Sequence, residues 1–308
     1  MRPEASREGG FMRFRLVLAA LAAVVFAVLP TSAGAIIGGQ PDGNNHPYVA
    51  YADNGVFACS ATLLSPTVML TAAHCFSDST SAYGVNTLTG GSIVRTTFDP
   101  DLTQANPSRV WHWGTYYFDP QFAIGSAGGL PGFDTHDVAI IVFTADGCHV
   151  PSNRNPVTNF CGPISLAETG GQHGVLPQQG LVDTLRNQTP VDLVGYGVRN
   201  YIRGGGPCGG PCKPATGDVF TRYAGQANAF ASNGVIGSEF LKLHANKVGV
   251  CHGDSGGPDL VAGTNIILAV NSFGGGQTCD SNTYSYRVDT QEALTWIANA
   301  IRLGGGSL

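Results

Sequence analysis

Short apolar segments alternate with clusters of glycine, proline and small polar residues along most of this chain. The segments are rich in valine, isoleucine, leucine and threonine and are too short for helices, which is typical of buried strands. Their spacing predicts an all-β fold, built as an antiparallel barrel or sandwich. The predicted strands cover residues 48–51, 61–64, 68–71, 138–143, 191–194 and 266–270.

One helix is predicted, over residues 290–301, because Leu294, Ile297 and Ile301 form an apolar stripe at helical spacing. We expect this helix to pack against a barrel. Residues 304–308 are three glycines, a serine and a leucine, so they offer little surface for packing. We expect them to form a flexible tail.

The first 35 residues have the pattern of a secretory signal peptide. Arg13 and Arg15 precede an apolar run over residues 16–29, and the segment ends in small residues at Ala35. The run is too short to span about 30 Å of hydrocarbon at a rise of about 1.5 Å per residue, which argues against a membrane anchor. We therefore expect cleavage after Ala35, with Met12 as an alternative start, and a secreted chain without stable membrane association.

A glycine-rich hexapeptide around Ser255 is the strongest chemical signal. It reads Gly253-Asp254-Ser255-Gly256-Gly257-Pro258. A serine that attacks a carbonyl needs backbone N–H groups facing the oxyanion that forms, and glycines let the backbone approach the substrate. The alternative is an ordinary glycine turn, since the chain has 43 glycines. The motif favours a nucleophile over a turn.

Two further segments supply partners for this serine. His74 ends the stretch Leu70-Thr71-Ala72-Ala73-His74-Cys75, and Asp137 stands at the start of the predicted strand over 138–143. An imidazole that accepts the proton of a serine must have its other N–H held, and a buried carboxylate does that. His74 is therefore the candidate base and Asp137 the residue that orients it.

Together these segments resemble the chymotrypsin-like (trypsin-fold) serine proteases, which carry their catalytic residues in the order His, Asp, Ser. The resemblance extends from Ile36 to Ile301. It implies two packed antiparallel six-stranded β-barrels with a C-terminal helix, in one domain over residues 36–303. Besides the His74, Asp137 and Ser255 segments, the matches are Ile36-Ile37-Gly38-Gly39, Gly195-Tyr196-Gly197 and Ser272-Phe273-Gly274.

The resemblance also implies a role for each matched residue. Ser255 is the nucleophile, His74 the general base and acid, and Asp137 the orienting carboxylate. The N–H groups of Gly253 and Ser255 form the oxyanion hole. Ser272 corresponds to a serine that hydrogen-bonds the aspartate, and residues 272–274 pair with the substrate backbone, although Phe273 stands where the family usually has tryptophan.

The resemblance to this family also implies how the enzyme is activated. In the family, cleavage of a precursor frees an ammonium group that forms a buried ion pair with the aspartate preceding the nucleophile. Ile36 and Asp254 correspond to these two positions. Because Ile36 would directly follow the signal peptide, we expect that signal cleavage itself activates the enzyme.

The resemblance also places Gly249, six residues before the nucleophile, at the floor of the primary specificity pocket. No carboxylate stands there to select arginine or lysine. Gly274 would leave one wall open, Thr283 would narrow the opposite side, and His252 borders the region. The sequence therefore predicts cleavage after small to medium apolar residues.

Eight cysteines in a secreted chain predict four disulfides, and no spacing typical of a zinc site is present. The resemblance pairs Cys59 with Cys75 and Cys251 with Cys279. Proximity favours pairing the remaining four as Cys148 with Cys161 and Cys208 with Cys212, and two crossed pairings stay open.

Composition restricts the partners. The chain has 16 basic and 21 acidic side chains and a net charge of −5, which becomes more negative once the four arginines and two glutamates of residues 1–35 are removed. This balance argues against nucleic-acid binding. We expect a monomer that acts on proteins or peptides and needs no cofactor or metal ion.

Two stretches, 77–135 and 149–188, are expected to be surface insertions. The first holds the aromatic segment Trp111-His112-Trp113-Gly114-Thr115-Tyr116-Tyr117-Phe118, for which packing is favoured over a substrate-binding face. Two other functions stay open: a catalytically silent binding protein, and an esterase with the same triad. An α/β-hydrolase is excluded, because its serine lies in a Gly-x-Ser-x-Gly elbow and its histidine follows the serine.

Overall fold

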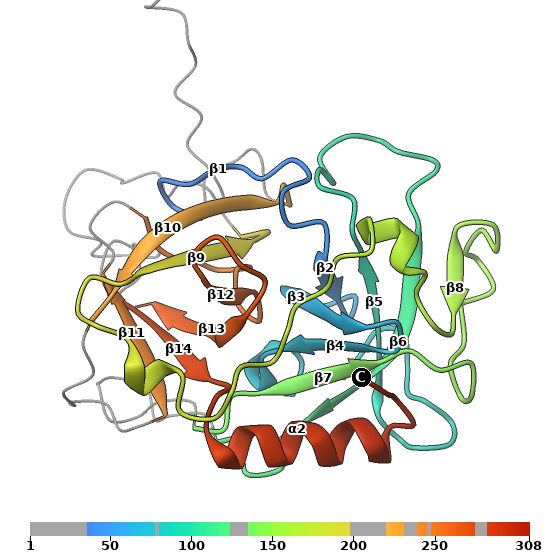
Figure 1. Cartoon of the computed structure of the whole chain (residues 1–308). Coiled ribbons are helices and arrows are strands. Elements are labelled where there is room, and N and C mark those ends of the chain that lie inside the picture. The colour runs from blue at the N-terminus through green and yellow to red at the C-terminus, as the bar shows by residue number, and fades with distance from the viewer. Residues whose placement is uncertain are drawn as a thin grey trace, which may run out of the picture. The chain divides into compact units, whose positions relative to one another are not determined.

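The computed structural model describes residues 36–77, 80–123, 135–197, 220–230, 239–244, 248–274 and 282–308. These residues belong to the compact unit Ala33–Leu308. Two β-barrels form this unit, and its one described α-helix lies near the C-terminus (Figure 1). In the part of the chain that the structure describes, no helix has the length and apolar character needed to cross a bilayer.

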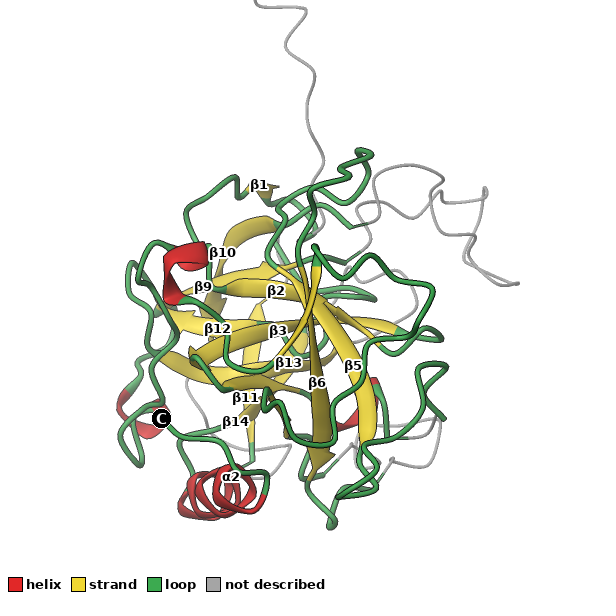
Figure 2. Ribbon diagram, turned by 90° about the vertical axis from the view of Figure 1, so that its right-hand side faces the viewer, coloured by secondary structure: helices red, strands yellow, loops and turns green. Residues whose placement is uncertain are grey.

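The first barrel closes six antiparallel strands in the order β5-β2-β3-β4-β7-β6, with β5 paired to β6. A short seventh strand, β8 (Asn159–Cys161), adds to β6 in parallel. Figure 2 shows β5 and β6 crossing in front of the other strands. The six strands of the barrel are β2 (Val49–Asp53), β3 (Ala58–Ser65), β4 (Val68–Thr71), β5 (Ser92–Thr97), β6 (Trp111–Phe118) and β7 (Ala139–Val142).

The second barrel also closes six antiparallel strands, in the order β10-β11-β14-β13-β12-β9, with β10 paired to β9. The two-residue strand β1 (Gln40–Pro41) adds to the outer edge of β10. The predicted fold of two six-stranded barrels is therefore confirmed. The six strands are β9 (Pro190–Gly195), β10 (Tyr223–Ala229), β11 (Phe240–His244), β12 (Pro258–Val261), β13 (Ile267–Gly274) and β14 (Thr283–Arg287).

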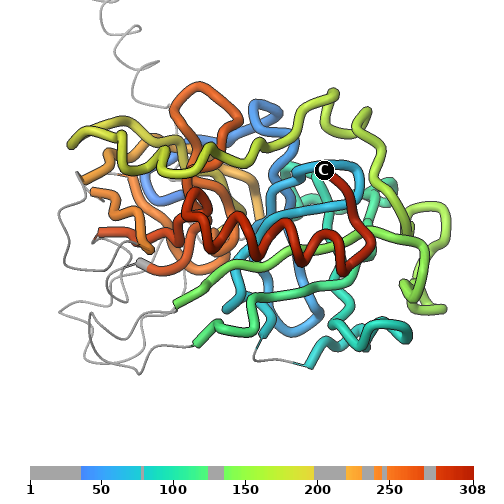
Figure 3. Tube along the Cα trace, turned by 60° about the horizontal axis from the view of Figure 1, so that its bottom comes forward, coloured from blue at the N-terminus to red at the C-terminus, as the bar shows by residue number. Residues whose placement is uncertain are grey.

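Helix α2 (Gln291–Leu303) confirms the predicted C-terminal helix, and it packs along β7 (Figure 3). It begins where Thr290 caps it, because the Thr290 hydroxyl accepts a hydrogen bond from the N–H of Ala293 at 3.1 Å. Its buried face is formed by Ala293, Ile297, Ala300 and Ile301. Three single-turn 3₁₀ helices are also described: η1 (Ala73–Cys75), η2 (Leu166–Thr169) and η3 (Val182–Thr184).

The segment 304–308, expected to form a flexible tail, makes contacts that the sequence did not predict. Ser307 is bound to the β3–β4 turn, because its N–H donates to Thr67 Oγ1 at 2.8 Å and its carbonyl accepts from the same hydroxyl at 3.0 Å. The Ser65 hydroxyl also donates to that carbonyl. The glycines permit this path, since Gly305 has a φ of 75°.

The expected insertion over 77–135 also needs correction, because it contains two strands of the first barrel, β5 and β6. The aromatic segment is β6 itself. Trp113 is fully buried and its indole N–H donates to Asn159 Oδ1 at 2.9 Å, so packing explains this segment. The stretch 149–188 contains β8, η2 and η3.

A buried ion pair ties the second barrel to the first. Arg222 and Asp42 are both fully buried at their side chains, and Nε of Arg222 donates to Asp42 Oδ2 at 2.8 Å. The same guanidinium donates to the carbonyl of Val49 on β2 at 2.9 Å. Burial raises the pKa of Asp42, but hydrogen bonds from His46 and the charge of Arg222 outweigh it, and the net shift is downward.

Candidate active site

His74 and Asp137 meet at the end of the first barrel. The turn η1 follows β4 directly and presents His74, whose backbone N–H and ring Nδ1 lie 2.8 Å from Asp137 Oδ1 and Oδ2, respectively. Asp137 is fully buried, and the Ser272 hydroxyl also donates to its Oδ2. A carboxylate only accepts, so the Nδ1 of His74 carries the donated proton and its Nε2 is left as the acceptor nitrogen.

Ser255 lies on a loop of the second barrel that packs against the same end of β3 and β4. The N–H of Ser60 donates to the carbonyl of Ser255 at 2.8 Å, and the Ser60 hydroxyl donates to the carbonyl of Gly253 at 2.9 Å. A side chain at Gly256 would come within 3.0 Å of the amide nitrogen of Ala72, two residues before His74. The loop can therefore reach η1 only because residue 256 is glycine.

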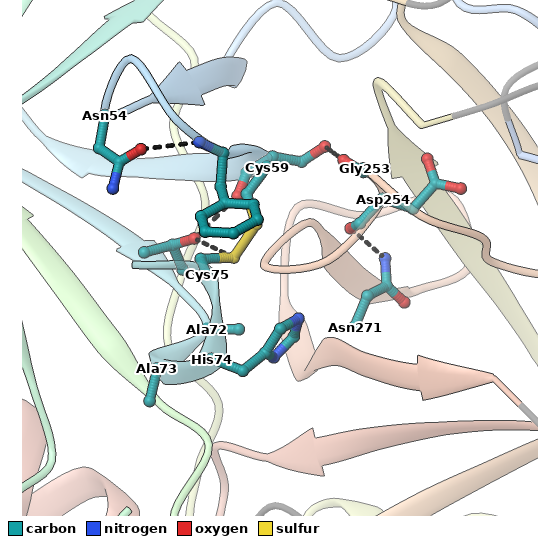
Figure 4. The surroundings of a disulfide bond; sticks show 12 residues. Asn54, Cys59, Ala72, Ala73, His74, Cys75, Gly253, Asp254 and Asn271 are labelled. Carbon is teal, nitrogen blue, oxygen red and sulfur yellow. Dashed lines mark hydrogen bonds between the residues drawn. A yellow bond between two sulfur atoms is a disulfide. The ribbon is translucent and has the colours of Figure 1, made fainter. Parts of the chain in front are cut away.

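Figure 4 shows the His74 ring on the side of the Cys59–Cys75 disulfide that faces Asp254 and Asn271. The Nδ2 group of Asn271 donates to the carbonyl of Asp254 at 3.3 Å and holds the serine loop against β13. The structure thus joins His74 of η1 to Asp137, which lies just before β7, and packs the loop that carries Ser255 against β3, next to β4 and η1.

The two predicted oxyanion-hole amides face no acceptor in the described part of the chain: neither Gly253 nor Ser255 donates its N–H to another described residue. Gly253 has a φ of 95°, a conformation that favours glycine. The N–H of Asp254, between them, donates to the carbonyl of Cys251 at 3.0 Å.

Asp254 is fully buried, and its carboxylate accepts hydrogen bonds from the amides of Gly197 at 2.8 Å and Cys251 at 2.9 Å. Burial raises its pKa to about 8, which these two hydrogen bonds lower only in part. A side chain at Gly195 would come within 2.3 Å of Asp254 Oδ1. The Gly195-Tyr196-Gly197 segment is therefore needed to admit this carboxylate.

The start of the predicted mature chain lies beside the predicted pocket. The N–H of Ile37 donates to the carbonyl of Gly249 at 2.9 Å, and the N–H of Gly249 returns a bond of 3.1 Å. Ile36 is fully buried in the core of the second barrel. The segment that follows the predicted signal peptide thus pairs with the residue expected at the floor of the pocket.

The other predicted pocket residues lie on β13 and β14 or beside the serine loop. Gly274 is paired with Thr283, which is buried, and the Phe273 ring stacks on that of Tyr284 with centroids 5.0 Å apart. His252 is exposed. No carboxylate belongs to this set of residues.

Two of the predicted disulfides are present, Cys59–Cys75 and Cys148–Cys161. Cys251 is also disulfide-bonded, but its expected partner Cys279 lies outside the described residues, as do Cys208 and Cys212. The sulfur atoms of Cys59 and Cys75 lie close to His74. Because both sulfurs are in a disulfide, neither can bind a metal ion as a thiolate, and this cluster does not form a metal site.

A family model described as Trypsin matches residues 36–118 and 135–297. The chain belongs to the trypsin family. A solved structure of HL collagenase shares the fold, with a TM-score of 0.53 and 17% identity over 85% of this chain and 95% of that one. A search of the curated proteins finds no match. Membership of the trypsin family places this chain among the hydrolases of the serine protease type.

Sequence reasoning missed one residue of this trypsin-family site. Ser60 is fully buried on β3, where it bonds the loop of Ser255 and also accepts a hydrogen bond from the N–H of Tyr196 at 3.0 Å. A small polar residue in an apolar strand was the available signal. These three partners, Gly253, Ser255 and Tyr196, come from the second barrel, so only the packed structure identifies the role of Ser60.

Proposed function

We propose that this protein is a secreted serine endopeptidase that hydrolyses peptide bonds through an acyl-enzyme on Ser255. The observation that carries the proposal is the pair of 2.8 Å contacts between His74 and the buried Asp137 carboxylate, next to the loop of Ser255. The disulfides and the predicted signal peptide support secretion.

In the proposed reaction, His74 Nε2 removes the proton of the Ser255 hydroxyl as its oxygen attacks the scissile carbonyl. Asp137 orients the imidazole and stabilises its positive charge, and the amides of Gly253 and Ser255 bind the oxyanion. His74 then gives its proton to the leaving amine. A water molecule, activated by His74 in the same way, hydrolyses the acyl-enzyme.

Removal of residues 1–35 is proposed to complete this site. The freed ammonium of Ile36 would supply a counter-charge for the Asp254 carboxylate, which among the described residues accepts from two backbone N–H groups and no cation. Since Asp254 lies between the two oxyanion-hole residues, its ionised and paired state would fix their amides.

Specificity is proposed to favour small to medium apolar side chains before the scissile bond. Gly249, Gly274 and Thr283 support this proposal, since none carries the negative charge that selection of arginine or lysine requires. A peptide library with every residue in that position tests it. Best turnover after arginine or lysine would contradict it.

The experiment for the proposed function is intact mass spectrometry of the secreted protein before and after treatment with a fluorophosphonate. We expect one adduct on a chain that begins at Ile36 and none on Ser255→Ala. No adduct on that chain would contradict the proposal and favour a silent binding protein. Turnover of an activated ester without cleavage of any peptide would favour an esterase.

A further inference from the structure

His136, the residue before Asp137, has a backbone conformation that residues with side chains rarely adopt. Its φ is 57°, in the left-handed region. Its carbonyl accepts the N–H of Val138 at 2.7 Å, which closes a three-residue turn with Asp137 at its centre. A strained position that persists must be held by its surroundings.

The side chain of His136 reaches helix α2. Its Nε2 lies 3.1 Å from Oε1 of Glu292, a residue of the first turn of α2 that is 156 positions away in the sequence. Because the carboxylate accepts, Nε2 of His136 donates. The Nε2 amide of Gln121 donates to the same Glu292 oxygen at 3.3 Å.

The other polar contacts around this turn are few. Among the described residues, Nδ1 of His136 and Oδ2 of the nearby Asp119 are buried without a hydrogen-bond partner. Asp119 contacts the turn through its backbone and not through its carboxylate, since its N–H donates to the carbonyl of Val138 at 3.1 Å. The Tyr286 ring lies 6.5 Å from the imidazole, centroid to centroid. Glu292 is thus the described polar group that holds the His136 ring.

We propose that His136 and Glu292 are positioning residues for Asp137, acting through the His136–Glu292 contact. This inference rests on the proposed function. The Asp137 carboxylate must offer one oxygen to the backbone N–H of His74 and the other to its ring, so a rotation of the turn lengthens both bonds. The contact fixes this rotation by tying the strained turn to the start of α2. It acts on the orientation of His74, not on substrate binding.

The experiment compares steady-state kinetics of the secreted protein and its variants. Glu292→Ala and His136→Gly each remove the contact, and glycine accepts the left-handed conformation. Loss of one such hydrogen bond is expected to lower kcat about tenfold and to leave KM unchanged. The double variant should lose the same factor as either single variant, because both act through one contact. Glu292→Gln keeps an acceptor and should restore kcat.

The matched control is Gln291→Ala, on the same turn of α2, whose side chain donates to Thr295 Oγ1 and has no other hydrogen bond to a described residue. Its kcat should stay at the parent value. Melting temperatures of all variants separate lost positioning from lost folding. A parent kcat in Glu292→Ala, an effect on KM alone, or additive losses in the double variant would overturn the positioning role.

One readout does not depend on activity. The proton between His74 Nδ1 and Asp137 should give a downfield NMR signal that shifts in Glu292→Ala and not in Gln291→Ala. An unchanged signal in Glu292→Ala would overturn the inference. A parent that shows this signal but takes no fluorophosphonate contradicts the proposed function alone, so the two failures are distinguishable.

Discussion

A single extra residue before Ile36 should make the folded chain less stable as the pH rises. The proposed role of the Ile36 ammonium is to neutralise Asp254, which is fully buried. A chain that keeps Ala35 in front of Ile36 has a peptide bond at this place and cannot supply that charge. The comparison is best made in a Ser255→Ala background, which prevents self-digestion.

The magnitude follows from the buried carboxyl. Without a cation, burial raises the pKa of Asp254 from 3.8 to about 8. Because the pKa of Asp254 is higher in the folded chain, the folded state is most stable at pH values below the pKa of the unfolded chain. This stability is lost as the pH rises toward the pKa of the folded chain. Each pH unit in this window costs about 1.4 kcal/mol, so about 3 kcal/mol is lost between about pH 5 and about pH 7. Released Ile36 should offset this loss.

The assay is urea unfolding of both chains at these two pH values, where an ordinary α-amino group is protonated. The stability advantage of the chain that begins at Ile36 should be larger at the higher pH by up to about 3 kcal/mol. An advantage that is equal at both pH values, or absent, would refute the proposed ion pair.

Three further changes test other parts of the structure. Ser272→Ala removes the hydroxyl that donates to Asp137 and should lower kcat/KM about tenfold in peptide assays; an unchanged value would show that this bond does not support catalysis. Replacing Cys59 and Cys75 together by serine opens a loop with a sequence separation of 16 and should cost about 3 kcal/mol in urea unfolding, whereas an unchanged midpoint would contradict the loop-entropy argument. Arg222→Met removes the arginine partner of the buried Asp42 carboxylate, which His46 alone among the described residues then hydrogen-bonds, and should cost up to about 3 kcal/mol by calorimetry, against a negligible shift if the pair contributes nothing.

The sequence by itself determined the features that depend on neighbouring residues. Strand β4 coincides with the apolar run predicted for it. Helix α2 begins at the residue after Thr290, because its N-cap and its apolar stripe are both encoded by neighbouring residues. The glycines around Ser255 were equally informative, since a side chain at Gly256 would clash with the strand before His74. Such local requirements can be read from residue types.

The tertiary structure alone decided which segments close the barrels. β6 contains polar and aromatic residues without a clear alternation, and it is buried because distant groups satisfy it: His112 bonds Glu168, and Trp113 bonds Asn159. The docking of Ser307 and the His136–Glu292 contact depend in the same way on residues far apart in the chain. A buried polar side chain is stable only where folding places its hydrogen-bond partner beside it. The pattern of residues along the sequence does not predict such contacts between distant residues.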